Sequence, residues 1–145
     1  MIPEAQDDGS LPPGLHSATW AELCERFGKN HHRRRLLAGL RIALENLRSA
    51  GCHTAFIDGS FITSEEFPKD FDGCWEVTGV DVAKLDPVLL TFDAGRATQK
   101  AKYSGEMFPS ISKANPQGDT FLQFFQMDRD GRPKGMLVLD LRRLP

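Results

Sequence analysis

Two short motifs contain residues that together could hold a metal-bound phosphate. The pair Gly59-Ser60 follows an apolar segment, residues 53–58, and nine residues separate it from Asp70 and Asp72. A turn of small residues exposes backbone N–H groups that can donate hydrogen bonds to phosphate oxygens. Alternate residues of a strand point to the same face, so the two carboxylates can converge on one divalent ion or on two neighbouring ions. The arrangement is suited to binding a nucleoside triphosphate with its metal ion.

Two helices are predicted ahead of the first motif. A capping box at residues 19–22 predicts a short helix that ends at Gly28. Asn30 can cap a second helix, which the spacing of its leucines extends to about Ser49. Only a tight turn separates this helix from the strand predicted over 53–58, so we expect the helix to pack directly on that strand.

The rest of the chain predicts a mixed sheet. The acidic strand should run from 71 to 77, and Asp130-Gly131 between two apolar runs is typical of a hairpin turn. The other predicted elements are a loop or short helix at 82–90, a helix at 94–103, a loop at 105–118, and hairpin strands at 121–127 and 135–141. This order predicts an α+β fold with a mixed β-sheet, an N-terminal helical segment and helices mainly on one face.

The composition is that of a globular chain. With 145 residues, 40% of them hydrophobic and 26% charged, we expect an N-terminal arm over 1–16 and a single domain over 17–145. The net charge of −2 argues against a general nucleic-acid coat. Three cysteines without metal-type spacing indicate reduced thiols. Without a leader-like N-terminus or a membrane-length apolar run, we expect a cytoplasmic protein with no membrane partner.

The two motifs resemble the core of the DNA polymerase beta-type nucleotidyltransferase superfamily. Its signature is a hydrophobic residue, then Gly, then Gly or Ser, and about a dozen residues later Asp-x-Asp. In this chain the likeness to the superfamily motif covers roughly residues 41–77. The chain is similar in particular to small bacterial proteins of that fold. The segments that carry this likeness are Leu11-Pro12-Pro13-Gly14, Asp58-Gly59-Ser60-Phe61, Asp70-Phe71-Asp72 and Asp140-Leu141-Arg142.

The resemblance implies a nucleotidyltransferase-like fold and transfer of a nucleotidyl group from a nucleoside triphosphate to a hydroxyl of an RNA, a protein or a small molecule. It implies that Asp70 and Asp72 share Mg²⁺ or Mn²⁺, and that Gly59 and Ser60 hold phosphate. A third carboxylate is expected on a later strand, and Asp140 is predicted to be this ligand or base; its alternative is an edge-strand carboxylate that faces water. The small bacterial members suggest a toxin–antitoxin or defence setting with a partner protein.

Cations for the phosphates are predicted after the acidic strand. Arg96, Lys100 and Lys102 are the candidates, and their alternative is a solvated helix face. The basic run at 31–35 is either a solvated helix start or a contact for an acidic partner, since Arg residues in a first turn oppose the helix dipole.

Three residues depart from the superfamily pattern. Asp58 stands where many small members have Phe, Phe61 stands where they have Arg, and Gly73 replaces a hydrophobic residue. An extra acid and a missing cation leave an alternative function open, namely a catalytically inactive nucleotidyltransferase-fold protein that acts as a binding or antitoxin-type partner. A structural or interaction protein, with Asp70 and Asp72 on its surface, is the third alternative.

Overall fold

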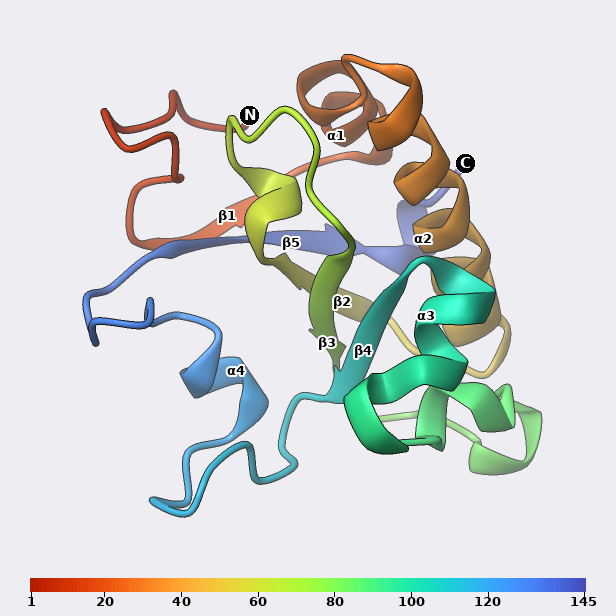
Figure 1. Ribbon diagram of the computed structural model, residues 1–145. Coiled ribbons are helices and arrows are strands. Elements are labelled where there is room, and N and C mark those ends of the chain that lie inside the picture. The colour runs from red at the N-terminus through yellow and green to blue at the C-terminus, as the bar shows by residue number, and fades with distance from the viewer.

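A mixed five-stranded sheet forms the centre of the structure, a computed structural model that describes residues 1–145 (Figure 1). The strands, in the sheet order β1-β5-β2-β3-β4, are β1 (Gly14–Ser17), β5 (Gly135–Asp140), β2 (Thr54–Asp58), β3 (Phe71–Trp75) and β4 (Gly105–Pro109). Strand β2 is antiparallel to both of its neighbours, and the outer strands β1 and β4 run parallel to β5 and β3. The α+β class predicted from the sequence is therefore confirmed.

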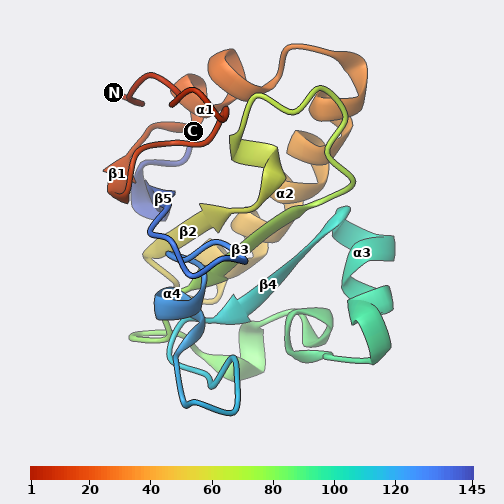
Figure 2. The same cartoon turned by 60° about the vertical axis from the view of Figure 1, so that its left-hand side comes forward.

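Three helices cover one face of the sheet (Figure 2). They are α1 (Trp20–Phe27), α2 (His31–Ser49) and α3 (Ala97–Tyr103). The predicted caps are present: Thr19 Oγ1 accepts a hydrogen bond from Glu22 N–H at 3.1 Å, and Asn30 Oδ1 accepts one from Arg33 N–H at 2.7 Å. A core of 26 buried residues fills the space between these helices and the sheet. None of the helices is both long and apolar enough to span a membrane.

The close approach of α2 to α3 depends on a glycine. A Cβ atom at Gly39 would lie 1.8 Å from the carbonyl oxygen of Tyr103, the last residue of α3. Such a contact is far below any van der Waals distance, so only Gly fits here. The packing fixes α3 and the turn before it, from which Arg96 and Lys100 extend.

A smaller core covers part of the opposite face of the sheet. Strand residues alternate between the faces. Four apolar strand residues on this face, Phe56, Cys74, Phe108 and Met136, form this core together with Phe125 from the connection that follows β4. The connection between β4 and β5, residues 110–134, lies over these residues and contains the one-turn helix α4 (Phe121–Phe124). Figure 1 shows α4 apart from the three larger helices.

Short 3₁₀ turns make up most of the other regular structure. They span Ser60–Ile62, Val82–Lys84, Pro87–Leu90, Ala94–Arg96 and Leu141–Arg143. The N-terminal arm is ordered, because Ile2 and Leu11 are buried in the core and residues 14–17 form β1. The expected boundary between arm and domain, at residue 16, thus falls inside a strand of the sheet.

The prediction of a loop over 105–118 is wrong for its first five residues. Residues 105–109 form β4, which pairs with β3 along its whole length. Gly105 and Pro109 disfavour a strand locally, and the backbone hydrogen bonds to β3 outweigh that preference. A parallel neighbour is a non-local partner, which a local pattern does not reveal.

The predicted strand over 121–127 and the C-terminal hairpin are also wrong. Thr120 and Gln123 form a capping box, with hydrogen bonds of 3.2 and 2.9 Å, and this capping box starts α4. Aromatic residues favour strands, but here they pack against one another around a single helical turn. Strand β5 instead pairs with β1 and β2, and Asp130-Gly131 forms a turn within the connection that precedes β5.

Candidate functional site

Three carboxylates form one row across the adjacent strands β2, β3 and β4, on the face opposite the three helices. Asp58 is the cross-strand partner of Asp72, and Asp72 is the partner of Glu106 on β4. Adjacent strands lie about 4.7–4.9 Å apart, so the row brings the three acids into direct contact range. Asp70 lies two residues before Asp72 and lines the same cavity. We call Asp58, Asp70, Asp72 and Glu106 the acid cluster.

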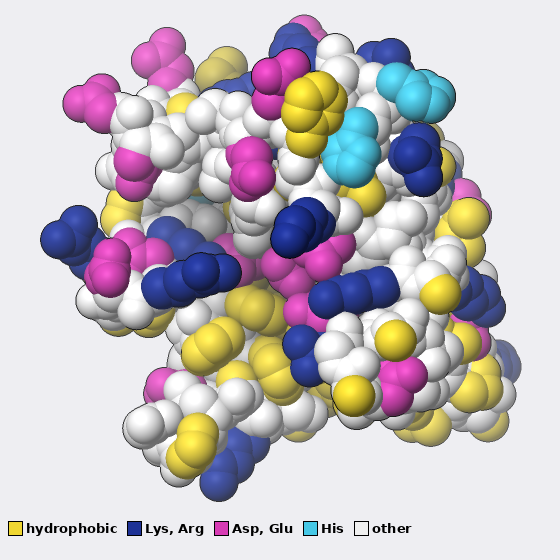
Figure 3. Space-filling model, in the orientation of Figure 1, with side chains coloured by type: hydrophobic (Ala, Val, Ile, Leu, Met, Phe, Trp, Pro, Cys, Tyr) yellow, Lys and Arg dark blue, Asp and Glu magenta, His cyan; other side chains and the backbone are white.

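The acid cluster lies in an open cavity of about 1200 Å³. Figure 3 shows Asp and Glu side chains gathered at the centre of this face, with Lys and Arg side chains around them and hydrophobic side chains below. Gly59 and Ser60 line the cavity beside the acids, and Lys69 also contributes to its wall. The two sequence motifs therefore meet at one site.

Gly59 is required at this site for two reasons. Its φ of +87° lies in the region that side chains with a Cβ atom rarely adopt, and a Cβ atom would lie 2.5 Å from Asp72 Oδ2. Its N–H donates a hydrogen bond to the Asp58 carboxylate. Ser60 then begins the 3₁₀ turn, and Phe61, the residue in place of the usual Arg, is fully buried in the core.

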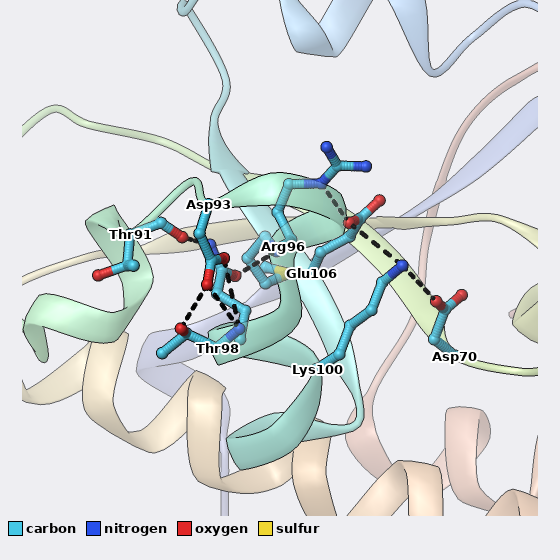
Figure 4. Close-up of polar contacts among 9 residues, drawn as sticks. Asp70, Thr91, Asp93, Arg96, Thr98, Lys100 and Glu106 are labelled. Atoms are coloured by element: carbon cyan, nitrogen blue, oxygen red, sulfur yellow. Dashed lines mark hydrogen bonds and ion pairs between the residues drawn. The ribbon is translucent and has the colours of Figure 1, made fainter.

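Cations from two segments pair with the acid cluster. Lys134, just before β5, donates to Asp58 Oδ2 at 3.1 Å. Arg96 donates from Nε to Glu106 Oε2 at 2.8 Å, and Lys100 Nζ lies 3.5 Å from Asp70 Oδ2. Figure 4 shows Glu106 between Arg96 and Lys100, with Lys100 extending toward Asp70.

A left-handed backbone conformation orients Arg96. Its φ is +53° and ψ is +40°, which is unfavourable for a residue with a Cβ atom. The following turn is fixed by Asp93, which accepts hydrogen bonds from the backbone and side chain of Thr98 (Figure 4). The Arg96 guanidinium also lies 5.9 Å from the centre of the Phe108 ring. Local strain of this kind is retained where the surrounding structure holds a functional side chain in place.

Asp72 has no cation of its own, and its surroundings favour the protonated form. Burial, a hydrogen bond with Glu106 and the negative charges of Asp70, Glu106 and Asp58 raise the pKa of Asp72 to about 8. Burial also raises the pKa of Asp58, against the opposing effect of Lys134. The cluster therefore holds more negative charge than its own cations balance, and a proton on Asp72 relieves the repulsion.

The donor set of the cluster matches Mg²⁺ or Mn²⁺ in its chemistry, since both ions prefer carboxylate oxygens. A divalent ion would relieve the same repulsion that holds the proton on Asp72. In the observed side-chain arrangement, however, no three Asp, Glu, His or Cys side chains surround a common ion position. Lys100 occupies the space between Asp70 and Glu106, so its ammonium group would have to move before an ion could bind to both.

Most of the residues predicted for the site lie together in the structure. Glu106 also belongs to the site, although it was not predicted from the sequence. The structure brings Gly59, Ser60, Asp70 and Asp72 to one cavity and places Arg96 and Lys100 beside the acids. The sequence contained a signal for Glu106, which is followed by the apolar pair Met107-Phe108. Lys134 carries no local signal, because only the fold brings it to Asp58.

Two predicted residues lie elsewhere. Asp140 is the cross-strand partner of Thr54, four residues along β2 from Asp58 and thus roughly 13 Å away along the strand. It pairs with Arg142 at 3.0 Å and is not part of the acid cluster. Lys102 forms an ion pair with Asp86, which also accepts a hydrogen bond from Tyr103. The direction of β5 places Asp140 away from the cavity, and the helix face on which Lys102 lies places it beside Asp86 instead.

The fold and the site together define an α+β protein with a row of carboxylates, one buried and two partly buried, in an open cavity. Residues 3–140 match the family of unknown function DUF6932, and the chain belongs to this family. The match spans all five strands, the acid cluster and the 110–134 connection. No curated protein and no solved structure matches the chain.

The raised pKa of Asp72 predicts that the free energy of unfolding falls as the pH rises from about 4 to about 8. The carboxyl of Asp72 titrates near 3.9 in an unfolded chain but near 8 in the folded protein. Between these values only the folded protein keeps the proton, so raising the pH removes stability, by at most about 1.4 kcal/mol per pH unit. Urea unfolding across this pH range measures the slope.

The matched variant for this measurement is Asp72→Asn, which should flatten the slope. A smaller slope from Asp58, whose pKa is also raised, should remain. Carboxyls with a lowered pKa, such as Asp86 and Asp140, act mainly below about pH 4 and do not interfere. Equal slopes for the wild type and the variant would contradict the assignment of the raised pKa to Asp72.

Proposed function

We propose that this protein is a metal-dependent nucleotidyltransferase that transfers a nucleotidyl group from a nucleoside triphosphate to a hydroxyl of an RNA, a protein side chain or a small molecule. The observation that carries the proposal is the meeting of Asp70, Asp72 and Glu106 with Gly59-Ser60 in one cavity. A sequence likeness in the two motifs alone would be weaker support. Under this proposal Glu106, rather than Asp140, would act as the third carboxylate on a later strand that the resemblance implies.

Each group in the cavity has a role under this proposal. Asp70, Asp72 and Glu106 would hold Mg²⁺ or Mn²⁺, which when bound neutralises triphosphate charge and polarises the phosphoryl group. The turn at Gly59-Ser60 offers backbone N–H groups to phosphate oxygens. Lys100, once released from the acids, is a cation for the same phosphates. The resemblance to small bacterial members adds a toxin–antitoxin or defence setting to the proposal.

A second candidate function is a catalytically inactive binding or antitoxin-type partner protein of nucleotidyltransferase-like fold. It is favoured by the ion pairs of Lys134, Lys100 and Arg96, which already balance much of the acid charge. A site that serves only as a structural ion-pair network would have this appearance without any ligand. The two functions differ in whether nucleotide binds at all.

A thermal-shift panel of the four nucleoside triphosphates, with and without Mg²⁺, tests the proposal. A triphosphate at 100 times its Kd stabilises the folded state by about 2.7 kcal/mol, which corresponds to a rise in melting temperature of roughly 5–10 °C for a chain of this size. We expect a rise that requires Mg²⁺. The nucleotide that gives it, labelled at the α-phosphate, is then used to follow transfer. A flat panel would refute the proposal and favour the inactive partner protein.

A further inference from the structure

The cavity has a second wall that the acid cluster does not use. Phe124, Phe125 and Met127 from the 110–134 connection line the same cavity as the acids. Its volume of about 1200 Å³ exceeds the roughly 300–1,000 Å³ of an ordinary small-molecule site. Polyphosphate bound at the acids would therefore leave a large part of the cavity empty. The hydrophobic side chains below the acids in Figure 3 lie in this direction.

Phe124 is exposed although its neighbours are packed. Its side chain is 44% exposed and that of Met127 is 43% exposed, whereas Phe125 is only 8% exposed. The Phe124 and Phe125 rings lie 5.8 Å apart between centroids. Phe125 in turn contacts Phe108 at 6.1 Å, so a buried aromatic anchor holds the exposed ring in place. Exposing a flat apolar ring inside a polar cavity is costly unless something covers it.

On β4 the acid cluster lies next to the smaller core that supports the aromatic residues of the cavity. On β4, Glu106 belongs to the acid cluster, and Phe108, two residues along the same face, belongs to the aromatic core. Two residues of a strand span about 6.6 Å. From Phe108 the rings continue through Phe125 to Phe124, with centroid separations of 6.1 and 5.8 Å. The ribose of a nucleotide sets its base apart from its phosphates, so a nucleotide extends from the acids in a way that phosphate alone does not.

We propose that Phe124, with Met127 beside it, is the stacking platform for the base of a nucleotide whose phosphates lie at the acid cluster. This inference rests on the proposed function and adds a base subsite to it. A nucleobase is flat and uncharged, so it fits the exposed ring of Phe124 better than it fits the acids. Gln117 lines the same cavity and makes no hydrogen bond within the protein, so its amide is free to contact the edge of the base.

The test compares dissociation constants for the four nucleoside triphosphates and for inorganic tripolyphosphate, all with Mg²⁺, by titration calorimetry. Tripolyphosphate has no base, so it reports only on the phosphate wall. Phe124→Ala should weaken nucleotide binding by about 5- to 150-fold, the usual effect of losing one aromatic stacking partner, and leave tripolyphosphate binding unchanged. Phe124→Trp should retain nucleotide affinity. Phe67→Ala is the matched control, because Phe67 is 59% exposed and does not line the cavity.

The outcomes separate this inference from the proposed function. If the wild type binds both ligands and Phe124→Ala leaves both constants unchanged, or weakens both equally, the base subsite is refuted and nucleotide binding stands. If the wild type binds neither ligand, the proposed function fails and the subsite fails with it. If Phe124→Ala changes only the sedimentation of the protein alone, the platform is an interface between copies, and the inference is wrong.

Discussion

Replacing Arg33 with Ala is expected to lower the free energy of unfolding by about 3–5 kcal/mol, the usual cost of breaking a buried charged network. The Arg33 side chain is only 4% exposed. It donates hydrogen bonds to four backbone carbonyls, among them those of Phe61 at 2.6 Å and Thr63 at 2.8 Å. The other two acceptors are the carbonyls of Phe27 and Glu65. Truncation would leave these carbonyls without donors in a buried place.

The same contacts tie the loop after Gly59-Ser60 to the start of α2. Burial lowers the pKa of Arg33, but its guanidinium stays charged and lies 5.3 Å from the centre of the Phe61 ring. The basic run at 31–35 is therefore not simply a solvated helix start or a contact for an acidic partner. Its central residue fixes the loop that leads from the Gly59-Ser60 turn to Asp70.

Urea unfolding at neutral pH measures the effect, with Arg35→Ala as the control, since Arg35 is exposed on the same helix. Arg33→Lys should recover only a small part of the loss, because one ammonium group cannot reach four carbonyls in the geometry of a guanidinium fork. A change below about 1 kcal/mol for Arg33→Ala, typical of a surface substitution, would show that the loop does not depend on this network.

Replacing Asp72 with Asn is expected to abolish Mg²⁺-dependent nucleotide binding without unfolding the protein. Loss of an outer-shell partner of a metal typically costs about 10- to 100-fold in affinity, so loss of a ligand should exceed about 100-fold. Asn has nearly the shape of protonated Asp, the form that the raised pKa favours at neutral pH. The variant should therefore match the wild type in stability near pH 4, exceed it increasingly as the pH rises to about 8, and keep that advantage at higher pH.

Asp140→Asn is the decisive comparison for this experiment. Asp140 is likewise a strand carboxylate with apolar neighbours in sequence, but it pairs with Arg142 at the far end of β2. Its replacement should leave nucleotide binding intact. Retained binding in Asp72→Asn, or lost binding in Asp140→Asn, would place the nucleotide site away from the acid cluster. Calorimetric titration of the nucleotide selected by thermal shift, with and without Mg²⁺, distinguishes these results.

The sequence predicts best what local contacts determine. The capping residues Thr19 and Asn30 and the leucine spacing of α2 depend on neighbours three or four positions away, and both helices form as expected. Strands β4 and β5 depend instead on partners far along the chain. Their register, which sets Glu106 beside Asp72 and Asp140 beside Thr54, follows from the crossover through α3 and from the direction of β5.

The candidate site divides in the same way. Gly59, Ser60, Asp70 and Asp72 occur within one short stretch, so their spacing alone could indicate a shared cavity. Glu106 was missed because the segment around it was predicted as a loop, and Lys134 because the hairpin prediction turned β5 toward the wrong neighbour. Along the chain, both residues are far from the Asp-x-Asp motif. Only the pairing of the strands in the sheet brings them close to the acid cluster.

The two walls of the cavity come from parts of the chain that differ in how well they tolerate substitutions and insertions. Three of the four acids project from the adjacent strands β2, β3 and β4, where a change of length would disrupt the sheet register and every backbone hydrogen bond that depends on it. The aromatic wall belongs to one surface connection, residues 110–134, which joins β4 to β5. Surface connections tolerate insertions and substitutions far better than strands do. Under the proposed function, a change in this connection alone would therefore alter which ligand is selected, while the acid cluster held by the sheet would stay the same.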